Sequence, residues 1–200
     1  MNADPGRHAL HLGVAEAGKV HALAHRHDEA LRHYREALRV AVSAGAPEVF
    51  FRHYTQCVLE SLELMGEHEE VIRFCEAADA HYEQVGHAVP LQRRDHAALL
   101  ERLGANRLKA GDAEGAGEAL RRAVELAGSG AQPLAEQLLG WLARHLEAGT
   151  ERITAAQRRS GYFTVRPDQV DPDRARPLEA GQGEAARMPF GRASPGGRRP

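Results

Sequence analysis

The chain has 200 residues and carries 26 Lys and Arg side chains against 28 Asp and Glu side chains, so its overall charge is close to zero. This balance gives no general attraction to nucleic acid or to an anionic membrane surface. No apolar run approaches the roughly 18 residues that a membrane-spanning helix needs, and the first residues lack the order of a secretory signal. Two cysteines are too few to cross-link a small secreted fold. We therefore expect a cytoplasmic protein with reduced thiols and no cofactor.

The first three quarters of the chain are rich in Ala, Leu, Glu and Arg, and Gly or Pro interrupts them at short intervals. This pattern is typical of short helices joined by tight turns. The expected organisation, in chain order, is a flexible N-terminus over 1–8, a helical domain over 9–149 with long helices at about 28–44 and 67–87 and a capping helix at about 132–148, and a short extra helix within 150–163. Trp141 falls on the apolar stripe of the capping helix, so we expect it in the core.

Residues 164–200 consist mainly of Pro, Gly, Arg and acidic residues without apolar periodicity. From residue 151 onward ten Arg accompany six acidic residues, so this end is basic while the rest is acidic. Such a segment buries too little apolar surface to offset its ordering entropy, which predicts a disordered tail over 164–200 whose deletion leaves the melting temperature nearly unchanged. A further hypothesis is that arginines of this tail weakly occupy an acidic groove on the body.

The helical part contains an internal repeat. Three segments share a turn, an acidic first helical turn, a small or apolar residue, an aromatic or apolar residue four positions later, and an alanine three positions after that. These last three positions are Ala30, Tyr34 and Ala37, then Val71, Cys75 and Ala78, then Ala116, Leu120 and Ala123. Gly18 and Gly104 stand twelve residues before Ala30 and Ala116, and we expect a helix to approach its partner closely at each glycine.

These positions resemble the tetratricopeptide repeat family, in which Gly18 and Gly104 match the small residue of the first helix. The second copy departs from the pattern, because Leu59 and Val71 replace small residues and Cys75 replaces the aromatic one. Successive copies lie 41 and 45 residues apart against the family's roughly 34, and the excesses are close to two and three helical turns. The resemblance covers roughly residues 10–149.

The resemblance implies an all-α fold, a right-handed superhelical stack of antiparallel helix pairs with about seven helices. Other helical hairpin repeats share parts of the pattern. It also implies a concave groove that binds peptides, whose polar side chains here are Lys19, His53, Gln56, Glu60, Glu63, Glu101 and Lys109. No asparagine stands at these positions, so the clamp by which chaperone-binding members hold a terminal carboxylate is absent. The groove suits a basic or amphipathic segment, unless these side chains only solvate a structural stack.

Two residue pairs have the four-residue spacing that can place two ligands on one metal ion: His21 with His25, and His53 with Cys57. A zinc site needs three or four convergent ligands, and no HExxH or CxxC motif accompanies either pair. We therefore expect surface histidines and no metal site. Cys75 is expected in the core and Cys57 partly exposed, and no hydrolase signature surrounds them.

The leading expectation is a non-catalytic scaffold or adaptor whose groove holds a helical or extended segment of another protein. The alternative is a peptide-responsive regulatory sensor, in which the long second helices change their packing. A histidine-based metal-binding protein or metal-assisted hydrolase comes third. Nucleic acid is a disfavoured partner, because acidic residues interleave with the arginines of the tail.

Overall fold

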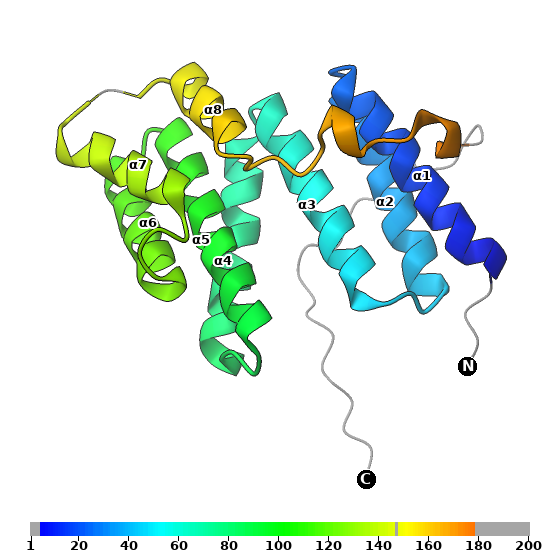
Figure 1. The fold of residues 1–200 in the computed structure, drawn as a ribbon, viewed down its shortest axis with the longest axis horizontal. Helices are drawn as coiled ribbons and strands as arrows, with labels where there is room; N and C mark the ends of the chain where they lie inside the picture. Colours follow the sequence, from blue (N-terminus) through cyan, green and yellow to red (C-terminus); the bar gives the residue numbers. More distant parts are fainter. Residues whose placement is uncertain (1–4, 147, 179–200) are drawn as a thin grey trace, which may run out of the picture.

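A computed structural model describes residues 5–146 and 148–178 of the chain (Figure 1). Within these residues the protein is all-helical and has no strand. Its α-helices are α1 (Pro5–Leu23), α2 (His27–Ser43), α3 (Glu48–Met65), α4 (His68–Val85), α5 (Pro90–Lys109), α6 (Ala113–Ala127), α7 (Pro133–Ala143) and α8 (Thr150–Arg159). Two single 3₁₀ turns follow, η1 (Pro167–Gln169) and η2 (Pro172–Arg174). Consecutive helices pack in pairs, which confirms the expected stack of helical hairpins.

Two predicted helix boundaries shift. The first helix begins at Pro5 and not at residue 9, because proline suits the first turn of a helix, where its missing N–H costs nothing. Helix α7 ends at Ala143 and not near 148, and His145 adopts a left-handed backbone conformation with φ of 50°. That conformation is uncommon for a residue other than glycine. The sequence therefore predicts that the helix ends at Gly149, the first glycine after it.

The two small residues of the repeat lie where helices approach closely. A Cβ atom at Gly104 would lie 2.5 Å from Cγ of Leu120, and one at Gly18 would lie 2.6 Å from Cε1 of Tyr34. Leu59 occupies the corresponding position of α3, and α3 and α4 come less close to each other than α1 and α2 or α5 and α6. The pair in which Leu59 and Val71 replace the small residues is thus the more widely spaced one.

Replacing Gly104 with alanine is expected to lower the free energy of unfolding by about 1–3 kcal/mol, because the added methyl group overpacks the α5–α6 contact. The matched control is Gly140→Ala in α7, where the nearest atom to an added Cβ is the flexible Arg144 side chain at 3.6 Å. That substitution should stabilise the protein by about 0.5–1 kcal/mol. Urea denaturation of both variants gives the comparison, and an equal response at the two sites would contradict the close approach.

The core runs along the whole stack. Trp141 is 6% exposed, and the Arg152 guanidinium carbon lies 4.4 Å from the centre of its ring. Cys75 is fully buried as predicted, but Cys57 is fully buried too, against the prediction of partial exposure. Both thiols are free. Burial raises the pKa of each thiol to about 12, so neither is a ready nucleophile.

Residues 161–178 form a strap across the face of the stack that carries Glu60 and Glu63 of α3. After α8 the strap crosses α3 and ends beside α1, as the orange segment in Figure 1 shows. The sequence places the start of a disordered tail at residue 164, but residues 164–178 pack against the helices. The rest of the predicted tail, 179–200, lies outside the described residues. The strap lacks apolar periodicity, and it is held by polar groups of the groove that the sequence does not bring together.

Candidate functional site

The centre of the groove is a buried ion pair between Glu63 of α3 and Lys109 of α5. The Lys109 ammonium lies 2.8 Å from the Glu63 carboxylate, and the two side chains are 1% and 0% exposed. The Tyr162 hydroxyl of the strap donates to the other carboxylate oxygen at 2.9 Å, and the Gln157 amide of α8 donates as well. Three helices and the strap therefore meet at this one carboxylate.

Glu63 is ionised in this environment. Burial alone would raise its pKa, but the Arg102 and Lys109 cations outweigh burial and hold the pKa below its usual value. Arg102 is only 4% exposed, and its guanidinium carbon lies 4.9 Å from the centre of the Tyr162 ring. Within the described parts of the chain, Nη1 of Arg102 has no hydrogen-bond partner. The groove thus holds a buried cation whose main cover is an aromatic ring of the strap.

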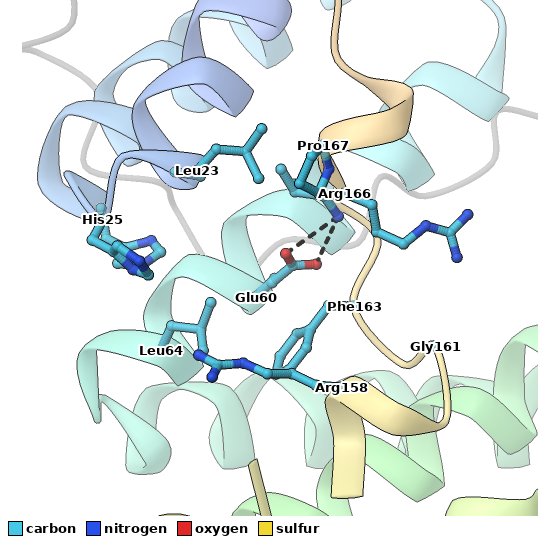
Figure 2. A pocket seen from close by; sticks show the side chains of 12 residues that line it. Leu23, His25, Glu60, Leu64, Arg158, Gly161, Phe163, Arg166 and Pro167 are labelled. Atoms are coloured by element: carbon cyan, nitrogen blue, oxygen red, sulfur yellow. Dashed lines mark hydrogen bonds between the residues drawn. The ribbon is translucent and has the colours of Figure 1, made fainter. Parts of the chain in front are cut away.

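Glu60, one helical turn before Glu63, holds the strap by its backbone. Its carboxylate accepts the backbone N–H of Thr164 at 2.6 Å. The backbone N–H of Val165 lies 3.2 and 3.3 Å from the two Glu60 oxygens, and these two contacts are the dashed lines in Figure 2. Phe163 and Val165 are each 9% exposed, so their side chains are buried beside this contact. The arrangement recognises the main chain of an extended segment, and it differs from the predicted arginine–glutamate pairs.

Burial, more than any other influence, raises the pKa of Glu60 to about 7. The Thr164 N–H and Arg102 oppose this rise without cancelling it. If the strap opens, water reaches the carboxylate and its pKa falls toward the ordinary value, so opening releases a proton. Raising the pH from 5 to 8 should therefore favour opening, because the open form ionises first.

We expect the protection of the Thr164 and Val165 amides against hydrogen exchange to fall by about tenfold or more between pH 5 and pH 8. The protection factor is taken relative to the intrinsic exchange rate at each pH, which removes the base catalysis of exchange itself. In Glu60→Gln the protection should not depend on pH. Equal protection at pH 5 and pH 8 in the wild type would exclude the linkage.

The far end of the strap is fixed to α1. The Asp171 N–H donates to the Glu16 carboxylate at 2.6 Å, and the Arg176 N–H donates to the carbonyl of Gly13 at 2.9 Å. A Cβ atom at Gly13 would lie 2.7 Å from the Arg176 side chain, so the strap lies directly on the helix here. Helix side chains and a helix carbonyl again accept main-chain N–H groups of the strap.

A cavity of about 280 Å³ lies beneath this end, between α1, α3 and the strap. Lys19 and His53 line it, and the Lys19 ammonium pairs with Glu16 at 3.0 Å. Burial and the nearby Lys19 charge lower the pKa of His53, so its neutral form is favoured. Two of the predicted groove residues thus lie away from the central ion pair.

The structure divides the seven predicted groove residues among several places. Glu60, Glu63 and Lys109 lie together under the strap, Lys19 and His53 line the outer cavity, and Gln56 is half-buried on α3. Glu101 is not part of the open groove, because its carboxylate accepts the Ala135 N–H of the first turn of α7 at 3.0 Å. Helix α7 packs against α5 here, so Glu101 is buried and bonded to α7.

Sequence reasoning missed three polar residues of the centre: Arg102, Gln157 and Tyr162. Arg102 is adjacent to a predicted groove position, but arginine is rarely buried, so its burial could not be expected. Gln157 and Tyr162 both lie in the segment 150–163, for which the sequence predicts only a short extra helix. The available signal was the Tyr162–Phe163 pair, two large aromatic residues beyond the last regular helix.

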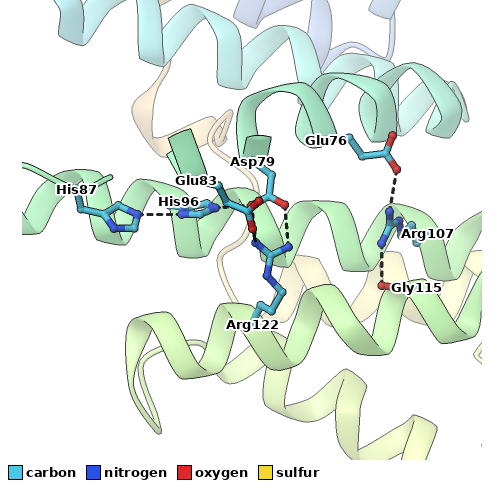
Figure 3. A network of polar contacts seen from close by, with 8 residues as sticks. All are labelled: Glu76, Asp79, Glu83, His87, His96, Arg107, Gly115 and Arg122. Carbon is cyan, nitrogen blue, oxygen red and sulfur yellow. Dashed lines mark hydrogen bonds and ion pairs between the residues drawn. The ribbon is translucent and has the colours of Figure 1, made fainter. Parts of the chain in front are cut away.

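A second polar cluster joins α4, α5 and α6 (Figure 3). His87 contacts His96 at 2.9 Å, and His96 contacts an oxygen of Asp79 at 2.6 Å. This row of three side chains resembles an acid–base relay. However, Arg122 donates hydrogen bonds to both oxygens of Asp79, at 2.7 and 2.8 Å. Burial would raise the Asp79 pKa, and the hydrogen bonds from Arg122 and His96 lower it overall. With both cysteines buried elsewhere, we interpret this cluster as a connection between helices.

The two pairs considered as metal ligands differ in geometry. His53 and Cys57 lie 3.9 Å apart, but Cys57 is buried. His21 instead faces the ring of His33, with ring centroids 4.7 Å apart. Among residues 5–146 and 148–178, no three His, Cys, Asp or Glu side chains are arranged to hold a metal ion.

Comparison with family models, with curated proteins and with solved structures gives no match to this chain. Within the described residues, no helix is both long enough and apolar enough to cross a membrane.

Proposed function

We propose that this protein is a non-catalytic interaction scaffold, whose concave groove binds an extended segment of a partner protein in place of its own strap. The observation that carries the proposal is the mode by which the strap is held. Glu60 and Glu16 accept main-chain N–H groups, and these exist in almost any extended peptide. Main-chain recognition combined with pockets for alternate side chains is a recurring way of binding peptides.

The strap competes with any partner. Tethered to α8 by a short connection, it has an effective concentration near the groove on the order of millimolar. A partner must displace it, and the apparent affinity falls by the fraction of molecules in which the groove is open. The strap thus makes binding selective for segments that fit the groove better than it does.

The test uses a labelled synthetic peptide with the sequence of residues 161–178. Fluorescence anisotropy is measured on the full-length wild type and on the full-length variant Phe163→Asp/Val165→Asp, in which the strap is weakened. The variant should bind the peptide at least about tenfold more tightly than the wild type, because the competitor in cis is removed. Adding Glu60→Ala to the variant should remove binding, whereas Glu125→Ala on the exposed face of α6 should not.

A scrambled peptide of the same composition controls for charge. If the weakened-strap variant binds neither peptide, or both equally, the groove is not a receptor for extended segments. The result does not depend on knowing the natural partner.

One observation also favours the alternative, a peptide-responsive regulatory sensor. The strap joins α3 at Glu60 to α1 at Glu16, so it is a bridge between two helices of the groove. Replacing it with a peptide that contacts only one of them would change the spacing of α1 and α3. Distance measurements between spin labels on these two helices, with and without bound peptide, distinguish a sensor from a rigid scaffold.

A further inference from the structure

A cavity of about 400 Å³ lies where the strap passes over the turn between α1 and α2. Three parts of the chain line it: the end of α1 with the following turn and the start of α2, the C-terminal turns of α3, and the strap with the end of α8 (Figure 2). Its volume falls within the range of small-molecule sites. Because the strap forms one wall, this cavity exists only while the strap is in place.

Part of the cavity lining is apolar. Leu23 comes from α1, Leu64 from α3 and Phe163 from the strap, and Figure 2 shows the three side chains around the same space. The cavity opens to solvent on one side, so a ligand can enter it without unfolding the strap. The apolar part of the lining favours the apolar body of a ligand.

The polar groups of the cavity differ in whether they already have a partner within the protein. Glu60 is its only carboxylate, and both of its oxygens already accept N–H groups of the strap. Arg158 is exposed, and no carboxylate of the described residues pairs with it. In Figure 2 its guanidinium lies beside Leu64 at the edge of the cavity, whereas that of Arg166 points away. His25 adds a second basic group to the mouth.

We propose that this cavity binds an amphipathic carboxylate, with its apolar body against Leu23, Leu64 and Phe163 and its acid group on Arg158. An arginine fork matches a carboxylate in geometry and in charge. The bound molecule contacts the strap, α1 and α3 together. By linkage it stabilises the closed form and opposes displacement of the strap by a partner.

The test uses octanoate as the probe on the full-length wild type, with octanol and octylamine as matched ligands of different charge. Titration calorimetry should show saturable binding of octanoate and at least about tenfold weaker binding of octanol, because the charge-assisted hydrogen bonds to Arg158 are lost. Arg158→Gln should weaken octanoate binding about tenfold. Arg159→Gln removes the neighbouring exposed arginine, which does not line the cavity, and should leave binding unchanged.

A second readout locates the ligand. Octanoate should shift the amide NMR signals of Gly161 and Phe163 and increase the hydrogen-exchange protection of Thr164. In Arg158→Gln, octanoate should change neither these NMR signals nor the Thr164 protection. If Arg158 had a purely structural role, octanoate would change both as it does in the wild type. No peptide is present, so the outcome is independent of the scaffold proposal.

Free acids and the C-terminal carboxylate of a peptide share this chemistry. An acetylated apolar tetrapeptide with a free C-terminus, and its amidated form, separate these two sources. Tighter binding of the free-terminus peptide than of octanoate would identify a peptide terminus as the ligand, and the reverse order a free acid. The proposal is overturned if no acid binds saturably at millimolar concentration, if octylamine binds as well as octanoate, or if Arg158→Gln binds octanoate like the wild type.

Discussion

Replacing Glu63 with alanine is expected to lower the free energy of unfolding by about 3–5 kcal/mol. The substitution leaves the Lys109 ammonium, which is 1% exposed, without its counter-charge, and it removes the carboxylate that helps to balance Arg102. The Tyr162 hydroxyl and the Gln157 amide lose their acceptor at the same time. An uncompensated buried cation is among the costliest defects that a single substitution can create.

Urea denaturation followed by circular dichroism measures this loss. The exposed pair of Glu29 and Arg32, 3.1 Å apart on α2, supplies the matched control. Glu29→Ala should cost no more than about 0.5 kcal/mol, because exposed ion pairs of this spacing contribute little. The double variant Glu63→Met/Lys109→Met should be less destabilised than Glu63→Ala, since it removes both charges of the pair and leaves Arg102 as the one buried cation of this centre that loses the Glu63 charge. A loss below about 1 kcal/mol in Glu63→Ala would mean that Lys109 readily reaches water.

The Glu63 carboxylate also makes the stability of the fold depend on pH, in a known direction. The Glu63 pKa is below its usual value in the folded protein, so the folded state binds this proton less readily than the unfolded state does. The corresponding stability is present above the ordinary glutamate pKa and is lost as the pH falls through the folded-state pKa. Glu60 acts in the opposite direction, because its raised pKa weakens the folded state as the pH rises toward 7.

The sequence predicted the helical stack well because its signals are local. Apolar spacing and turn glycines are visible within single helices, and the close approach at Gly104 followed from the small residue that the first and third copies of the repeat share. The groove was predicted in part for the same reason, since Glu60 and Glu63 lie on one helix one turn apart. Lys109 joined them because the repeat placed α5 beside α3.

The strap could not be predicted because its binding surface is formed by distant residues. Residues 164–178 have the composition of a solvated tail, and composition measures only what a segment can bury by itself. Their main-chain N–H groups instead meet Glu60 and Glu16, more than a hundred residues earlier in the chain. Whether a polar segment stays in solvent or docks depends on acceptors elsewhere in the fold.

Deleting residues 161–200 is therefore expected to destabilise the protein, where composition alone predicts almost no effect. The deletion removes Tyr162 from Arg102 and exposes the surfaces that Phe163 and Val165 cover. Burying one large apolar side chain contributes about 1.5–3 kcal/mol. Renewed hydration of Glu60 and Arg102 offsets part of the loss. We expect a net cost of about 2–4 kcal/mol, and a melting temperature lower by about 5–15 °C for a chain of this length.

Truncation after residue 178 is the matched control, because it keeps every strap contact described here and removes only the Gly-, Arg- and Pro-rich end. Differential scanning calorimetry of the full chain and the two truncated proteins gives the comparison. The protein that ends at residue 178 should melt within about 2 °C of the full chain, since segments of the composition of 179–200 bury little surface. Equal melting temperatures for all three proteins would show that the strap adds no stability.

The stability that the strap adds also sets how strongly a partner must bind to displace it. Weak partners would displace a strap that contributes little. A strap that contributes about 2–4 kcal/mol lowers the apparent affinity of any competitor by roughly 30- to 900-fold.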